Sequence, residues 1–125
     1  MTDYSHLTLE KYCDALASNE PTPGGGTAAA VALSQGAALA IMVCNLTLGK
    51  EKWKEGWNSA ENCMSIANRA TSRGFELAAE DAGAFDRVMA AYKMPKNTDD
   101  EIEVRRTKIR EETLNAAIVP METAR

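Results

Sequence analysis

The sequence predicts an all-α fold, a bundle of about four helices that assembles into an oligomer. Alanine is abundant, while aromatic residues make up only 6% of the chain, which favours helices over strands rich in branched and aromatic side chains. Apolar residues recur at helical spacing, and no segment alternates as a strand does. The length of 125 residues suits a single domain, so we expect one helical domain over residues 1–125.

The first predicted helix covers about residues 8–18, with Thr8 as its N-cap. Its apolar residues recur at three- and four-residue steps: Leu9, Tyr12, Cys13 and Leu16. Residues 18–26 (SNEPTPGGG) contain two prolines and three glycines, so we expect a loop, called here the glycine loop. Glycine permits a positive φ or the close approach of another group to the backbone.

Residues 27–48 are almost wholly small or apolar (TAAAVALSQGAALAIMVCNLTL), which predicts a helix buried on most sides. The stretch is also long enough to cross a bilayer. Gln35, Asn45, the weak hydrophobicity of alanine and the many charges elsewhere speak against a membrane span. We therefore expect a core helix and no membrane association, and a small membrane-inserting protein is the least favoured alternative.

A charged connection at residues 50–56 (KEKWKEG) leads into a long amphipathic helix. Its apolar stripe comprises Trp57, Ala60, Met64, Ala67, Ala70, Leu77, Ala78, Phe85, Val88, Met89 and Tyr92. An unbroken helix over residues 57–93 would be about 55 Å long, whereas a compact monomer of this length has a radius of gyration of about 14 Å. Either Gly74 breaks the helix, or the helix packs on a partner chain, and both can hold. The sequence therefore predicts a homodimer or a higher homo-oligomer.

The last predicted helix starts at Thr98, where Glu101 completes a capping box. Its weak apolar stripe consists of Ile102, Ile109, Ala116 and Ala117, and we expect Pro120 to disturb the helix.

Charge and cysteine content exclude several classes of function. The net charge of −4 provides no basic field for nucleic acid. Three cysteines without CxxC spacing and a single histidine argue against a metal site and a disulfide framework. The N-terminus lacks a basic segment followed by an apolar run, so we expect a cytoplasmic protein with reduced thiols.

Two features can support chemistry. A glycine-rich segment entering a helix presents unpaired backbone N–H groups to an anion or polar ligand, although an interhelical turn explains the same residues. Asp81 lies four residues after Leu77 and four before Phe85, which places a carboxylate on an apolar helical face. Burial there would raise its pKa and suit it to proton transfer. The alternative is a structural aspartate paired with an arginine or a helix end.

The far end of the apolar helix carries further polar residues. Asn45 and Thr47 need hydrogen-bond partners within the bundle or in a ligand. Lys50 suits the C-terminal end of a helix as a solvated cap, and it can also bind the carboxylate of a ligand.

Several blocks, taken together and in order, resemble one family. They are PTPGGGTAAA at 21–30, MVCNLTLGK at 42–50, DAGAF at 81–85, AYKMPK at 91–96 and VPM at 119–121. The chain is similar to the cyclodeaminase/cyclohydrolase family, which comprises formiminotetrahydrofolate cyclodeaminases, the C-terminal part of formiminotransferase-cyclodeaminase, and methenyltetrahydrofolate cyclohydrolases. The resemblance extends from about Leu7 to the last residue.

The resemblance implies a dimer-forming helical protein that acts on a tetrahydrofolate derivative at the bridge between N5 and N10. The reaction would be ring closure with loss of ammonia, or hydrolysis of the methenyl bridge, without a metal or a tightly bound cofactor. It implies that Asp81 is the acid/base or steadies the cation, and that Lys50 holds a glutamate-tail carboxylate. The remaining folate-cleft residues would be Pro23, Gly24, Gly25, Gly26, Thr27, Asn45 and Thr47.

One departure from the family leaves a second function open. Family members usually continue for several more helices, so the chain corresponds to the N-terminal part of the family domain. The alternative to a folate enzyme is therefore a catalytically silent oligomerisation scaffold.

Overall fold

The computed structural model describes residues 1–125 and contains helices and their connections, without a strand. The elements in chain order are the 3-10 helix η1 (Tyr4–His6), α1 (Leu9–Ala17), α2 (Gly25–Thr47), the 3-10 helix η2 (Glu51–Gly56), α3 (Trp57–Tyr92) and α4 (Asp99–Ala124). The prediction of an all-α chain with four main helices is confirmed.

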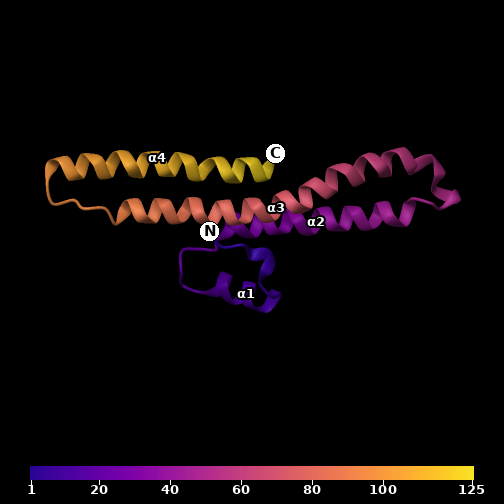
Figure 1. The fold of residues 1–125 in the computed structure, drawn as a ribbon, viewed down its shortest axis with the longest axis horizontal. Coiled ribbons are helices and arrows are strands. Elements are labelled where there is room, and N and C mark those ends of the chain that lie inside the picture. Colours follow the sequence, from indigo (N-terminus) through magenta and orange to yellow (C-terminus); the bar gives the residue numbers. More distant parts are fainter.

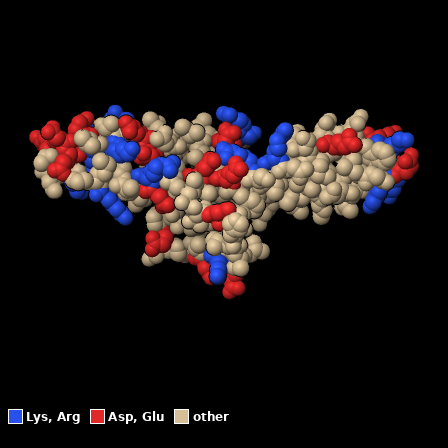
Figure 2. Space-filling view, viewed as in Figure 1, with Lys and Arg blue, Asp and Glu red and all other residues tan.

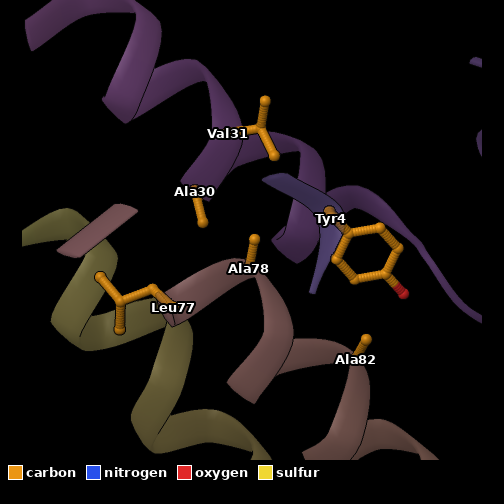
Figure 3. Close-up of a cluster of buried hydrophobic side chains, with 6 residues drawn as sticks. All are labelled: Tyr4, Ala30, Val31, Leu77, Ala78 and Ala82. Carbon is orange, nitrogen blue, oxygen red and sulfur yellow. The ribbon is translucent and has the colours of Figure 1, made fainter. Parts of the chain in front are cut away.

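The helices form an elongated arrangement in which α2 and α3 make an antiparallel hairpin (Figure 1). The last helix, α4, returns along the C-terminal half of α3, and the segment with η1 and α1 lies beside the middle of the molecule. The core is located where these parts meet (Figure 3), and it consists of Tyr4, Ala30, Val31, Leu77, Ala78 and Ala82. Because half of these residues are alanines, the helix backbones can approach one another closely.

Gly74 lies where α3 packs tightly against α2, and α3 runs through it without a break. A Cβ atom at this position would lie 2.8 Å from the carbonyl oxygen of Ala30 and 3.0 Å from the backbone nitrogen of Ser34, and it would overlap the Ser34 hydroxyl. The Ser34 hydroxyl donates to the carbonyl oxygen of Thr71 at 2.7 Å. The expected break at Gly74 is therefore wrong, because the glycine serves helix packing.

Both predicted N-caps are present. The Thr8 hydroxyl accepts from the backbone N–H of Lys11 at 3.2 Å, and the Thr98 hydroxyl accepts from that of Glu101 at 3.1 Å. In contrast, Pro120 does not interrupt its helix, since α4 continues to Ala124.

Packing against α3 holds α4 in place. The buried Glu112 carboxylate contacts Arg87 Nε of α3 at 3.3 Å and Lys108 Nζ of α4 at 3.0 Å. Val119 packs against the core cluster. These contacts lie on either side of Ala116, so α4 is anchored on both sides of the turn that precedes Pro120.

Burial of the alanine-rich helix α2 is one-sided within this chain. Its buried residues are Thr27, Ala30, Val31, Ser34, Ala37 and Cys44. The other side exposes Leu39, Met42, Val43 and Leu46, so α2 is not covered on most sides by its own chain. By length and hydropathy α2 could also cross a membrane, but the core helix of a globular protein meets the same criteria.

Candidate functional site

A cavity of about 350 Å³ opens where the start of α2 meets α3 and α4. Its lining comes from the glycine loop, from Asp81 and Phe85 of α3, and from Ala116 and Pro120 of α4. Phe85 is 41% exposed, and it adds an aromatic side chain to this lining. The two strongest candidates from the sequence, the glycine loop and Asp81, therefore border one cavity.

The glycine loop is shorter than expected, because α2 already begins at Gly25 and Gly24 is its N-cap. None of the three consecutive glycines has a positive φ; Gly49 is the glycine that does, at 79°. Gly26 instead permits a close approach, since a Cβ atom there would overlap the Asp81 carboxylate. Thr22 ties the loop to α3 by donating its hydroxyl to Asp86 Oδ1 at 2.9 Å.

Asp81 reaches from α3 to the first turn of α2. The buried Thr27 hydroxyl lies 3.4 Å from Asp81 Oδ2 and 3.2 Å from the carbonyl oxygen of Ala78, to either of which it can donate. Burial raises the pKa of the Asp81 carboxyl, while hydrogen bonds from the Thr27 hydroxyl and backbone N–H act in the opposite direction. The direction of the pKa shift agrees with the expectation from helical periodicity.

This arrangement has both a structural and a chemical use. A carboxylate at the N-terminus of α2 satisfies donors that the helix leaves unpaired. A carboxyl group whose pKa is raised toward neutrality can also accept and return a proton to a molecule in the cavity. The backbone N–H groups of Gly25 and Gly26 lie in the first turn, where they have no intrahelical partner and can donate to a polar ligand.

The other candidate residues lie at the opposite end of α2. The 23 residues of α2 span about 33 Å at 1.5 Å per residue. Asn45 and Lys50 are exposed there. Thr47 donates its hydroxyl to the carbonyl oxygen of Val43 at 2.8 Å, and its own carbonyl accepts from Trp57 Nε1 at 3.1 Å. Within one chain, the structure does not bring these three residues to Asp81.

Five residues that line the cavity are not among the candidates from the sequence: Pro21, Thr22, Phe85, Ala116 and Pro120. Phe85 follows Asp81 by one helical turn, so the periodicity of the long helix already placed the two on one face. In the sequence, Pro120 indicates a disturbed helix and belongs to one of the blocks that resemble the family, but neither signal places it at the site. The contribution of α4 to the cavity depends on tertiary packing, and no local pattern indicates it.

Nearly the whole chain matches proteins of one family. The family model described as formiminotransferase-cyclodeaminase matches residues 8–125. The chain is 46% identical over 120 residues to a methenyltetrahydrofolate cyclohydrolase from Methylorubrum extorquens, covering 94% of this chain and 57% of that protein. It is 30% identical over 117 residues to the formimidoyltransferase-cyclodeaminase of Rattus norvegicus, covering 94% of this chain and 22% of the rat protein.

A solved structure agrees with these sequence matches. The crystal structure of a formiminotetrahydrofolate cyclodeaminase from Thermotoga maritima aligns with a TM-score of 0.78 and 33% identity, over 94% of this chain and 55% of the other. The chain thus spans little more than half the length of the bacterial relatives that it matches. With the match to the family model over residues 8–125, the chain belongs to the formiminotransferase-cyclodeaminase family.

Proposed function

We propose that this chain binds a reduced folate in the cavity beside the glycine loop and acts on the one-carbon unit bound to N5 and N10. The observation that carries the proposal is the position of Asp81, a carboxyl with a raised pKa at the wall of the cavity. The names of its relatives, a methenyltetrahydrofolate cyclohydrolase and a formiminotetrahydrofolate cyclodeaminase, support the same substrate class.

Both candidate reactions need proton transfer beside one carbon atom. In hydrolysis, water attacks the methenyl carbon and loses a proton. One C–N bond then breaks as its nitrogen takes up a proton and the remaining O–H proton is released, leaving a formyl group. In cyclisation, N10 attacks the formimino carbon on N5 and loses its proton, and the protonated amino group leaves as ammonia. Asp81 would accept and return the proton in either case, or steady the cationic methenyl carbon by its charge.

The two reactions can be separated by the sign of one signal. Hydrolysis consumes 5,10-methenyltetrahydrofolate and cyclisation produces it, so its absorbance should fall with the methenyl substrate or rise with the formimino substrate, faster than in buffer alone. If the folded protein changes neither rate, the silent oligomerisation scaffold is the better interpretation. Titration with 5-formyltetrahydrofolate then tests binding separately from turnover.

We also infer that the functional form is a homodimer or higher homo-oligomer. The accessible surface of the chain is 8547 Å², against about 6,500 Å² for a typical monomer of 13.5 kDa. Figure 2 shows an arm, made by α2 and the N-terminal half of α3, that is mostly uncharged on the visible face, with charges gathered at its tip. The exposed apolar stripe of Leu39, Met42, Val43 and Leu46 lies on this arm and suits a second copy.

A dimer would also bring the candidate site residues at the far end of α2 close to a cavity. If two α2 helices pack antiparallel, the Asn45–Lys50 end of one copy approaches the Gly25 end of the other. Asn45, Thr47 and Lys50 would then contribute to the cavity of the partner, with Lys50 near the glutamate tail. Because Trp57 is hydrogen-bonded to Thr47, quenching of its fluorescence by 5-formyltetrahydrofolate would report that the ligand reaches this end.

We further propose that residues 1–125 act as one unit, corresponding to the N-terminal part of the family domain, in the cytoplasm. The three cysteines are unpaired, which fits a reducing compartment. No tightly bound cofactor is needed for the chemistry above, because the folate itself carries the one-carbon unit.

A further inference from the structure

Pro120 lies inside α4, four residues before its end at Ala124. Proline has no backbone N–H, so the helical hydrogen bond from position 120 to the carbonyl oxygen of Ala116 cannot form. The proline ring also crowds that carbonyl. A proline in a helix interior costs about 3 kcal/mol relative to alanine, yet α4 tolerates it without a break.

The two residues that flank the freed carbonyl line the cavity. In an α-helix the carbonyl of one residue points toward the residue four positions later, so the Ala116 oxygen lies between Ala116 and Pro120. Both residues line the cavity that contains Asp81 and the first turn of α2. Ala116 is partly buried at this wall, and Pro120 is exposed.

The polar groups around the cavity are therefore of two kinds. The first turn of α2 supplies backbone N–H donors through Gly25 and Gly26, while Asp81 and the Ala116 carbonyl are acceptors on the walls made by α3 and α4. Phe85 adds an aromatic side chain to the lining. A flat heterocycle with N–H groups and a carbonyl oxygen on its rim would match this set.

We propose that the Ala116 carbonyl oxygen, released by Pro120, accepts a hydrogen bond from an N–H group of the pterin ring of the bound folate. This inference rests on the proposed function and adds a ligand-positioning role for the backbone of α4. The pterin ring carries several N–H donors, and in this pose the p-aminobenzoyl-glutamate portion would not reach the Ala116 carbonyl. Pro120 is then a positioning residue, since it acts through the carbonyl that it leaves free.

The test compares Pro120→Ala with the parent and with Asn115→Ala. Alanine at position 120 restores the N–H group, so the Ala116 carbonyl becomes occupied within the helix. The affinity for 5-formyltetrahydrofolate should fall about three- to tenfold, as for the loss of one hydrogen bond, while the melting temperature rises. Binding of the fragment p-aminobenzoyl-glutamate should stay unchanged. Asn115 is exposed and does not line the cavity, so Asn115→Ala should raise helix stability without changing either affinity.

Each other outcome overturns the inference in a distinguishable way. Equal folate affinity of Pro120→Ala and the parent would show that the carbonyl makes no contact with the ligand. An equal loss in both variants would trace the effect to the stability of α4. If the parent itself binds no folate, the proposed function fails first, and the role of Ala116 fails with it.

Discussion

The carboxylate of Asp81 on α3 occupies the space into which a side chain at Gly26 on α2 would project. The next residue of α2, Thr27, places its hydroxyl 3.4 Å from the same carboxylate. One carboxyl group thus joins the first turn of α2 to the middle of α3, and the missing side chain at Gly26 sets its position. A structural aspartate and a proton-transferring one would both use this arrangement, so variants are needed to separate the two roles.

We predict that Gly26→Ala displaces the Asp81 carboxylate without unfolding the protein. The clash is with the end of a side chain, and alanine gains about 0.5–1 kcal/mol of helix preference over glycine, so the two effects on stability partly offset. Once displaced toward solvent, Asp81 loses the burial that raises its pKa. Its pKa should therefore return toward its ordinary value, as measured by NMR titration of the carboxyl carbon, and turnover should fall.

Gly25→Ala is the matched control for this change. No atom lies within 4 Å of a Cβ built at position 25, so the Asp81 titration should be unchanged and the melting temperature equal or higher. Of the two uses expected for these glycines, a positive φ and a close approach, the structure shows the second, at Gly26. A similar titration shift in both variants would contradict the assignment of Gly26 as the tight position.

A second prediction concerns Asp81→Asn, which keeps the volume and removes the charge. The native pKa of Asp81 is raised by burial, so its contribution to stability is present below the unfolded pKa and is lost as pH rises through the native pKa. The variant should therefore be at least as stable as the parent at neutral pH, and this advantage should disappear in acid. Turnover of the folate substrate should fall by about 10²–10⁴-fold if Asp81 is the acid/base.

Melting temperature and turnover, measured on one preparation across pH, decide the role of Asp81. Lost stability with activity preserved per folded molecule would identify a structural aspartate that caps α2. A stable variant with lost turnover would identify a proton-transferring one.

Local signals in the sequence predicted most of the helices and some of their ends. Thr8 and Thr98 cap helices through donors three residues away, so a short window of sequence contains the whole motif. The start of α2 was placed too late, because Asp81, far along the chain, contacts the turn that contains Gly25 and Gly26. Pro120 was expected to disturb α4, but packing against α3 holds that helix together.

The candidate site was predictable only in part. Helical periodicity indicated Asp81, and the glycine composition indicated the loop that it touches. The wall made by Ala116 and Pro120 depends on how α4 returns along α3, which no local pattern encodes. Likewise, the distance between Asp81 and Lys50 follows from the uninterrupted length of α2.

A third prediction concerns Gly74→Ala, which should be far more damaging than Gly26→Ala. At position 74 the added methyl would meet backbone atoms of Ala30 and Ser34, and these cannot move without separating α2 from α3. We expect a loss of about 1–3 kcal/mol or more, as for overpacking of a core, measured by denaturant unfolding. Ser34→Ala combined with Gly74→Ala should recover little stability, because the backbone contacts persist. A full recovery would mean that the serine side chain alone required the glycine.

The last prediction is that the exposed stripe of α2 holds two copies together. Leu39, Met42, Val43 and Leu46 are each 50–60% exposed in the single chain, and their three- and four-residue spacing places them on one face of the helix. Met42→Glu should place a charge at the centre of this contact and shift the protein toward monomer in sedimentation at micromolar concentration. Leu9→Glu, on an exposed residue of α1, is the control that should leave the sedimentation unchanged.

Ligand binding can be measured on the same samples. If Asn45 and Lys50 of one copy complete the cavity of the other, Met42→Glu should lose affinity for 5-formyltetrahydrofolate together with its dimer, because a single chain holds these residues at the far end of α2. Raising the protein concentration should restore both properties in parallel. A parent protein that sediments as a folded monomer would exclude the dimer. A monomeric Met42→Glu that binds folate as the parent does would place the whole site within one chain.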